Sequence, residues 1–271
     1  MRLYRAIIKM SIKIEKLKET KDRITFSIDG ISNTFANAIR RSTFEIEVLA
    51  IDLVEFYKND SALYDEMIAL RLGLLPLKAP KTFTRREDCS CKGKGCLKCT
   101  ASFKLKAKGP ATVYSKELKA KGCEIVFEEM PLVILAKDQE LELSAEACIG
   151  AAREHTKFLP GLVWFRSNPV INLTKDTESY TDLINVCPKK AIISKGSKIE
   201  IDPLKCDLCE CCIEYCNEKN KKPLDLKASE DSFTMFVESF GQLEPKDLFI
   251  ESLSIIDKNL DEVVKAIKKP K

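Results

Sequence analysis

Several residue types on which enzymes commonly depend are scarce in this chain of 271 residues. It contains one histidine, His155, which excludes mechanisms that need two or more imidazoles. It contains ten glycines, none of which stands in a glycine-rich phosphate-binding loop. No nucleophile paired with a base and no pair of carboxylates in a metal-binding motif is found either. We therefore expect a chain without catalytic residues of its own.

Long apolar segments are absent as well. No apolar run approaches the roughly 18 to 20 residues of a membrane-spanning helix. The N-terminus lacks the long apolar core and the cleavage site of a signal peptide. We expect a cytoplasmic protein with no membrane partner.

A strong charge of one sign is also missing. Lys and Arg number 45 against 41 for Asp and Glu, so the net charge is +4. A charge this small does not indicate a surface that holds nucleic acid by itself. The basic runs at residues 78–86, 219–222 and 265–271 are interpreted as solvated faces. No direct sequence-specific contact with DNA is expected.

Cysteine, by contrast, is abundant. Four of the twelve cysteines lie in residues 89–99 and six lie in residues 187–216. Cys123 and Cys148 are isolated, and we interpret them as small buried hydrophobic residues. Clustered cysteines in a chain without a secretion signal are typical of metal sites rather than of a disulfide framework. Each cluster therefore predicts a metal centre.

The second cluster has the spacing of an iron-sulfur site. Residues 206–216 read C-x2-C-x2-C-x3-C, the run of bacterial ferredoxins, in which the last cysteine ligates a second cluster. A further ligand for the first cluster must then come from elsewhere, and the cysteine before Pro188 is the candidate. The predicted iron-sulfur ligands are Cys187, Cys206, Cys209 and Cys212.

One cluster is expected, and 4Fe-4S is the predicted type. The positions that would supply the other ligands of a second cluster are Thr177, Tyr180 and Leu183. Without the upstream cysteine, the three-cysteine run would hold a 3Fe-4S species, and a four-cysteine zinc site is the alternative at the same place. Cys211 and Cys216 have no assigned role.

Residues 191–202, which lie between the two parts of the proposed ligand set, predict two short strands around a turn.

The first cluster predicts structural zinc. Its cysteines form two pairs separated by the flexible sequence KGKG. Four thiolates from two such pairs complete a tetrahedral zinc shell and leave no open position for catalysis. A pair of disulfides is the alternative. The predicted zinc ligands are Cys89, Cys91, Cys96 and Cys99.

Periodicity predicts a hairpin near one end of the chain and a helix near each end. Residues 11–17 and 23–30 alternate apolar and polar positions, which predicts an antiparallel hairpin. Ser32 or Asn33 is expected to cap a following helix, and Pro245 to open a last one. The first apolar stripe is Phe35, Ala38, Ile39, Ser42 and Ile46. The second is Leu253, Ile256, Leu260, Val263 and Ile267.

Several stretches resemble the family of alpha-like subunits of archaeal DNA-directed RNA polymerase, the counterparts of the third-largest subunit of eukaryotic polymerase II and of the bacterial alpha N-terminal domain. The family's first helix is similar to NTFANAIRRSTFEIEVLAID, and the opening of its inserted domain to SALYDEMIALRLGLLPL. Its return strand is similar to EHTKFLPGLVWFR, and the entry into its last helix to SFGQLEPKDLFIESLSII. A ferredoxin-like insert lies between these last two stretches. The resemblance covers nearly the whole chain.

The resemblance implies an α+β fold whose dimerisation domain is split between the chain ends. Residues 1–50, 160–175 and 223–271 form that domain. It is interrupted by a β-rich insert domain at 51–159, which carries the zinc loop, and by a ferredoxin-like iron-sulfur domain at 176–222. Residues 1–9 precede the usual start of a family member and are expected to be an over-extended start or a disordered tail.

The implied function is assembly of an archaeal DNA-dependent RNA polymerase, in which nucleotidyl transfer belongs to the complex and not to this chain. The implied partners are subunit L, in a heterodimer, then subunits N and P and the large catalytic subunits. Arg40 and Arg41 point away from the apolar stripe, either as a solvated edge or as a contact with a large subunit. The alternative function is a ferredoxin-type electron carrier or reductase subunit. The predicted interface residues are Phe35, Ile39, Arg40, Arg41, Ile46, Leu253, Ile256, Leu260 and Val263.

Overall fold

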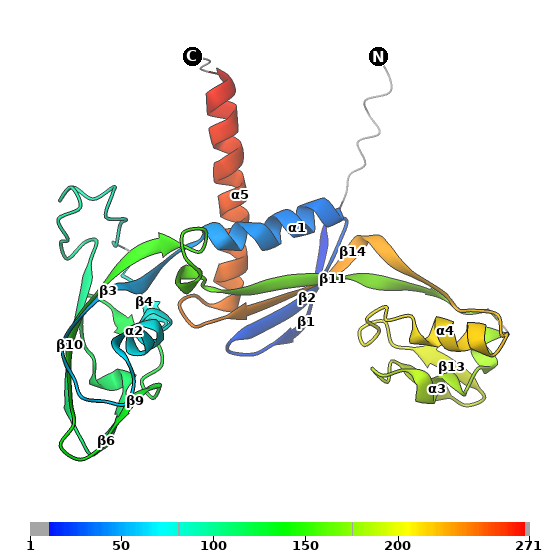
Figure 1. The fold of residues 1–271 in the computed structure, drawn as a ribbon. Coiled ribbons are helices and arrows are strands. Elements are labelled where there is room, and N and C mark those ends of the chain that lie inside the picture. The colour runs from blue at the N-terminus through cyan, green and yellow to red at the C-terminus, as the bar shows by residue number, and fades with distance from the viewer. Residues whose placement is uncertain (1–10, 81, 175, 269–271) are drawn as a thin grey trace. The chain divides into compact units, whose positions relative to one another are not determined.

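The computed structural model describes residues 11–80, 82–174 and 176–268 (Figure 1). These residues form two compact units. Within the described residues, the first unit contains residues 11–19, Thr25–Asn37 and Trp164–Phe236. The second contains Thr20–Ile24, Ala38–Val163 and residues 237–268. The expectation for residues 1–9 concerns a segment outside the described residues.

A four-stranded sheet in the order β1-β2-β14-β11 joins segments from both ends of the chain. Its strands are β1 (Lys13–Glu19), β2 (Arg23–Asp29), β11 (Gly161–Asn172) and β14 (Asp225–Ser239). The predicted hairpin is confirmed, because β1 and β2 are neighbours and the Thr20 N–H donates to the Arg23 carbonyl at 2.8 Å in the turn. The alternation in β2 buries Phe26 and Ile28.

The first predicted helix is shorter than its apolar stripe indicated. Helix α1 (Asn33–Ser42) begins after Ser32, whose hydroxyl accepts the Phe35 N–H at 3.2 Å. It ends at Ser42, and a 3-10 turn, η1 (Thr43–Glu45), follows. Ile46, expected on the helix, therefore lies beyond it, although it is buried. The Ser42 hydroxyl donates back to the Ile39 carbonyl, which tightens this last turn.

The last predicted helix is confirmed as α5 (Pro245–Lys268). Its first half is buried through Leu248, Phe249 and Ile255. From residue 257 onward every described residue of the helix is exposed, including the apolar ones. The second half of the predicted stripe therefore faces solvent in the isolated chain.

The second unit contains an antiparallel sheet in the order β3-β10-β5-β7, with a dense apolar core beneath it. Its strands are β3 (Glu47–Asn59), β10 (Glu140–Ala151), β5 (Ala101–Lys108) and β7 (Lys119–Lys121). Burial alternates strictly along β5, as expected for a strand with one face on the core. The register between β3 and β10 shifts at Asp52, which has no partner opposite it.

Smaller elements complete this unit. They are α2 (Asp65–Gly73), the strand pairs β4 (Leu77–Lys78) with β8 (Glu124–Ile125) and β6 (Ala111–Tyr114) with β9 (Pro131–Leu135), and the turns η2 (Ser115–Glu117) and η3 (Thr156–Phe158).

In the first unit, residues 173–224 form a small layer around one hairpin. The expected strands are confirmed as β12 (Ile192–Lys195) and β13 (Lys198–Ile201), with Ile192 opposite Ile201. Around them lie η4 (Thr177–Ser179), α3 (Leu183–Val186) and α4 (Cys211–Glu218). In the described part of the chain, no helix has the length and apolar character needed to cross a membrane.

Candidate metal centres

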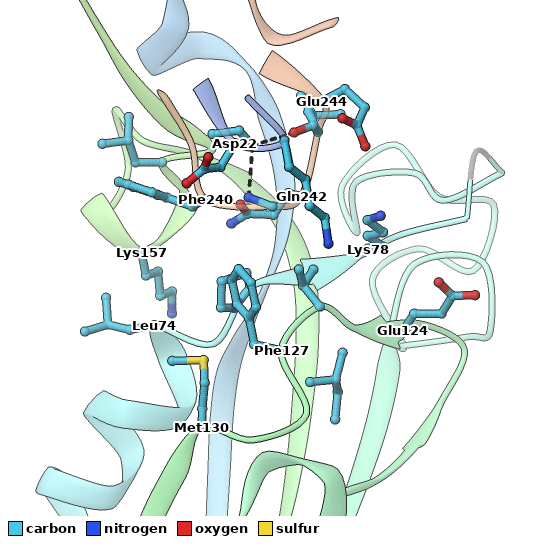
Figure 2. Close-up of a pocket in the computed structure, with 18 of the residues that line it drawn as sticks. Asp22, Leu74, Lys78, Glu124, Phe127, Met130, Lys157, Phe240, Gln242 and Glu244 are labelled. Atoms are coloured by element: carbon cyan, nitrogen blue, oxygen red, sulfur yellow. Dashed lines mark hydrogen bonds between the residues drawn. The ribbon is translucent and has the colours of Figure 1, made fainter. Parts of the chain in front are cut away.

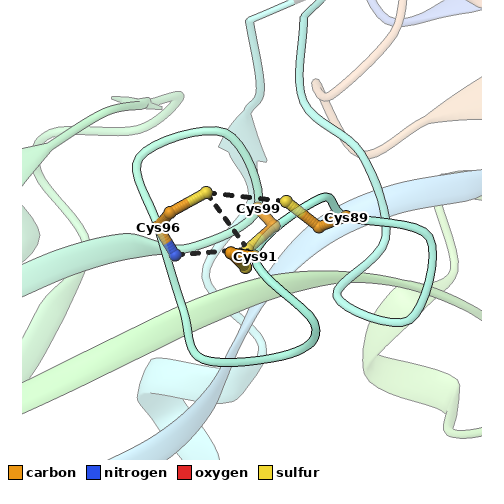
Figure 3. A group of neighbouring side chains, drawn as sticks. All are labelled: Cys89, Cys91, Cys96 and Cys99. Carbon is orange, nitrogen blue, oxygen red and sulfur yellow. Dashed lines mark hydrogen bonds between the residues drawn. The ribbon is translucent and has the colours of Figure 1, made fainter.

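The four cysteines of the first cluster converge in the loop that precedes β5 (Figure 3). Their sulfur atoms all lie within 4.8 Å of one another. The Cys89 and Cys96 sulfurs are 3.5 Å apart, and those of Cys91 and Cys99 are 3.6 Å apart. Cys89 and Cys99 are buried, while the other two are half-buried. Four thiols this close together form a ligand set that can hold a metal ion.

The loop backbone explains how these residues converge. Each cysteine pair closes a turn, because the Lys92 N–H donates to the Cys89 carbonyl and the Cys99 N–H to the Cys96 carbonyl, both at 2.9 Å. Gly93 and Gly95 between the pairs both have a φ of +78°, where glycine avoids the strain of a Cβ atom. The glycines therefore let the chain reverse between the two ligand pairs.

The hydrogen bonds around the four thiols shift their pKa values in opposite directions. Backbone N–H donation from Cys91 lowers the pKa of Cys89 to about 6. The Lys98 N–H acts in the same direction on Cys96, but hydrogen bonds with the neighbouring cysteines outweigh it and raise the pKa of Cys96 to about 11. Four adjacent thiolates repel one another unless a cation neutralises them, so full deprotonation requires a bound metal ion. The donor set therefore fits a thiolate-bound metal.

Two arginines fasten this loop to the sheet. Arg86 donates to the Thr100 hydroxyl at 3.1 Å and to the Glu146 carboxylate at 2.6 Å. Arg85 bridges Glu47 and Glu154, at 2.6 Å each. The interpretation of residues 78–86 as a solvated face is therefore wrong for its last two residues. The sequence pattern missed them because their acidic partners lie far away in the chain.

The predicted iron-sulfur ligands line one cavity in the first unit. Cys187 follows α3, Cys206 and Cys209 lie in the loop before α4, and Cys212 stands in its first turn. Cys211 lines the same cavity. Its sulfur atom lies 3.8 Å from the Cys209 carbonyl oxygen.

The backbone of this loop is strained between the cysteines. Leu208 and Glu210 have φ values of +60° and +61°, a left-handed conformation that non-glycine residues rarely adopt. The Ala191 N–H donates to the Cys187 sulfur at 3.3 Å, as a backbone amide does to a metal-bound thiolate. Among the described residues, only the first cluster brings its cysteine sulfurs close enough together to hold a metal ion, so the iron-sulfur ligand set stays a prediction that rests on the cysteines lining one cavity.

The remaining cysteines lie apart from these two sets. Cys216 is fully buried in the apolar core of the small layer and does not line the cavity. Cys123 and Cys148 are half-buried, so the expectation of burial holds for them only in part. Burial raises the pKa of both thiols to about 11, so they stay protonated at neutral pH.

The predicted interface residues divide by exposure. Ile39 and Ile46 are buried within the chain, so they belong to its interior rather than to an exposed surface. Phe35 is 37% exposed, and Arg41 is exposed.

On α5, the exposed part of the predicted stripe lies in the second half of the helix. Leu260 and Val263 are more than half exposed, at 59% and 55%, whereas Leu253 and Ile256 are half-buried. Sequence periodicity missed one further exposed apolar residue, Val264, because it lies beside the stripe rather than on it.

A cleft of about 810 Å³ also opens in the second unit (Figure 2). Apolar side chains dominate it, among them Leu74, Phe127 and Phe240. Gln242 stands in a wall that this cleft shares with a second groove, because it lines both. The Oε1 atom of Gln242 is buried and has no hydrogen-bond partner among the described residues.

Comparison with known proteins gives one consistent result. A family profile for the RNA polymerase Rpb3/RpoA insert domain matches residues 54–160. The DNA-directed RNA polymerase subunit Rpo3 of Methanothermobacter thermautotrophicus is 33% identical over 257 residues, which cover 92% of this chain and 96% of the relative. The proteins of the same name from Methanosarcina acetivorans and Pyrococcus horikoshii are 34% and 31% identical, and the matches cover 98% of each relative.

Proposed function

Because this chain belongs to the Rpo3 family of DNA-directed RNA polymerase subunits, it is an assembly subunit of an archaeal RNA polymerase, and we propose that it acts by pairing with subunit L. The pair then forms the platform for subunits N and P and for the large catalytic subunits. Nucleotidyl transfer is the chemistry of the complex, and this chain contributes surfaces and not reacting groups. The alternative of an electron-transfer protein is not favoured, since the relatives that span the chain are polymerase subunits.

The observation that carries the pairing proposal is the exposed half of α5. Burying a leucine, valine or isoleucine side chain is worth about 1.5 to 3 kcal/mol relative to leaving it fully exposed. A partner that covers such residues on α5 would gain this free energy. A contiguous apolar stripe of this kind is typical of a protein interface. The exposed apolar residues are Leu260, Val263, Val264 and Ile267.

The proposal is tested by co-expression of this chain with subunit L and measurement of the mass of the purified species. We expect a one-to-one heterodimer that then retains subunits N and P. A chain that elutes alone, with subunit L in a separate peak, would contradict the pairing.

Arg41 is the proposed contact with a large subunit, with Arg40 beside it on α1. Arg41 is exposed in the isolated chain, and it leaves the helix on the side away from the buried Ile39. Loss of an arginine buried in an interface typically costs about 2 to 5 kcal/mol, whereas an arginine at the rim costs far less. Arg41→Ala should therefore weaken binding of the large subunits while the pair with subunit L stays intact. Unchanged assembly would instead favour the alternative that these arginines lie on a solvated edge of the helix.

Zinc is the proposed metal of the first centre. The closed set of four thiolates leaves no open position, so the ion holds the loop and supplies no catalysis. We expect about one equivalent of zinc in protein purified without chelators, and loss of that zinc in Cys96→Ser. Arg86→Gln should keep the zinc but loosen the attachment of the loop to the sheet, which limited proteolysis would detect. Less than half an equivalent of zinc in the unaltered chain would contradict the site.

An iron-sulfur cluster is the proposed occupant of the second cavity, held by Cys187, Cys206, Cys209 and Cys212 in a ferredoxin-like domain. When bound, the cluster cross-links the loop before α4 to the segment after α3 through iron–thiolate bonds. The residues of this chain supply the strained turn at Leu208 and Glu210 and the amide donor of Ala191. We propose a structural and regulatory role in assembly, because the small layer has few buried apolar residues beyond those around its hairpin.

A further inference from the structure

A groove of about 550 Å³ lies in the second unit, between one side of α5 and the start of β3. Its lining includes the apolar residues Leu49, Ile149 and Ile255. Pro80 and Phe83 line it as well. The groove therefore combines apolar side chains from separate parts of the chain.

The walls of this groove are acidic. Lys258 is the only basic residue among the described residues that line it. A local excess of carboxylates is notable in a chain whose net charge is +4. The lining carboxylates are Glu45, Glu47, Asp247, Glu251 and Glu262.

Internal ion pairs neutralise only part of this charge. Arg153 pairs with Glu45, Arg85 pairs with Glu47 at 2.6 Å, and Lys258 approaches Glu251 at 3.4 Å. Within the described residues, no ion pair is formed by Asp247 or Glu262. Asp247 and Glu251 are also four residues apart on α5, a spacing at which like charges destabilise a helix. The helix thus presents two carboxylates along this groove that have no ion-pair partner among the described residues.

Gln242 supplies an independent observation at the same place. Its Oε1 atom is buried without a hydrogen-bond partner among the described residues, and the residue lines the groove. A buried acceptor without a donor lowers stability, because it has lost its hydrogen bonds to water and gained none in return. The groove wall therefore holds a buried, unsatisfied acceptor beside its carboxylates, and the carboxylates are the groups that an occupant with cationic side chains can pair with.

We propose that this groove binds a segment of another polymerase subunit that carries lysine or arginine side chains on an amphipathic face. The proposal rests on the assembly function proposed above. The apolar side of the segment packs on the apolar residues of the groove, and its cations pair with Asp247 and Glu262.

The groove is separate from the apolar stripe assigned to subunit L. At about 100° per residue, Glu251 and Glu262 lie on one side of α5, and Leu260 and Ile267 lie roughly half a turn around the helix. A partner that covers the stripe therefore leaves the groove open for a second segment. Assembly around α5 is thus expected to use two faces with different chemistry.

Zero-length carbodiimide crosslinking of the intact polymerase tests the proposal, because it joins a carboxylate to a lysine amine only where the two are in contact. We expect crosslinked peptides that connect Asp247, Glu251 or Glu262 of this chain to a lysine of another subunit. Glycine ethyl ester is included to label carboxylates that remain open to solvent. Free labelling of Asp247 and Glu262, with no crosslink to another subunit, would overturn the proposal. Failure of the chain to co-purify with the polymerase would instead overturn the assembly function, and the groove proposal with it.

A charge-neutral variant gives a second measurement. Asp247→Asn combined with Glu262→Gln should reduce recovery of the crosslinked subunit about fivefold at low salt, with little difference at about 0.5 M salt, where the charges are screened. Asp261→Asn is the matched control, because Asp261 is exposed on the same helix but does not line the groove. Equal recovery of the subunit with the double variant and the control at low salt would overturn the proposal.

Discussion

Arg166 on β11 donates a hydrogen bond to the backbone carbonyl of Leu204, two residues before Cys206. The same guanidinium lies 5.8 Å from the centre of the Phe236 ring, and Phe236 stacks on Trp164 at 5.3 Å. Its Nε atom is buried and lacks a partner among the described residues. A long strand of the first unit is thereby tied to the loop that carries the proposed cluster ligands.

Replacement of Arg166 should therefore loosen the proposed cluster site. A hydrogen bond from a charged donor is worth about 1.5 to 3 kcal/mol, so Arg166→Gln should speed bleaching of the cluster by a chelator about tenfold or more. Arg166→Lys keeps a charged donor and should restore part of the difference. Absorbance at visible wavelengths follows the bleaching.

Arg23→Gln is the matched control for that experiment, because Arg23 forms its ion pair with Glu238, away from the cysteine loop. The chain has one tryptophan, so the emission of Trp164 reports on the same contact. Identical bleaching rates for Arg166→Gln and Arg23→Gln would show that the contact with Leu204 does not support the site.

The assignment of cluster ligands makes opposite predictions for two cysteines of the second cluster. Cys206→Ser removes a proposed ligand and should abolish the brown colour of anaerobically purified protein. Cys216→Ser should keep the colour, because Cys216 is buried in the apolar core and does not line the cavity. That variant should instead lose about 1 to 3 kcal/mol of stability, since a hydroxyl replaces a buried thiol. A colourless Cys216→Ser protein that remains folded would mean that the ligand register is wrong.

The ion pair between Asp52 and Lys157 makes stability depend on pH. The Lys157 ammonium, by a hydrogen bond, holds the pKa of Asp52 below its usual range. The pair therefore stabilises the fold above the unfolded-state pKa of about 3.9, and this contribution is lost as the pH falls through the folded-state pKa. Because about half of the Asp52 side chain is exposed, we expect a contribution of at most about 1 kcal/mol.

Thermal unfolding of Asp52→Asn beside the unaltered chain measures this contribution. The variant should melt at a lower temperature at pH 7, and the difference in melting temperature should shrink as the pH falls below about 4. A difference that stays constant between pH 7 and pH 3 would mean that Asp52 acts through something other than its charge.

Local patterns predict the elements whose signals are themselves local. The hairpin of β1 and β2 follows from alternation, and α5 begins at Pro245 as expected. The sequence overestimates the length of α1 because Ile46 continues the helical spacing, although Ser42 and Thr43 turn back on the helix end through their hydroxyl groups. Periodicity does not record such side-chain bonds.

At the candidate sites too, contacts within one short loop can be predicted from the sequence, whereas contacts between distant segments cannot. The spacing of the cysteines between Cys89 and Cys99 is enough to predict that they meet, because the ligands belong to one short loop. The arginines that fasten this loop escape such a prediction, since Arg85 and Arg86 pair with carboxylates 38 to 69 residues away. The acidic groove also depends on residues from several distant segments, which only the fold brings together.

The most direct test of the central claim, that this chain assembles a polymerase through α5, is the binding of subunit L by Val263→Asp. Val263 is 55% exposed in the isolated chain, so the variant should fold normally, whereas the half-buried Ile256 is a less clean position. A carboxylate placed in the apolar interface has no partner and should cost more than about 3 kcal/mol. We predict that Val263→Asp loses subunit L on co-purification while the control Lys265→Gln retains it. Recovery of Val263→Asp with subunit L at the unaltered yield would contradict the account.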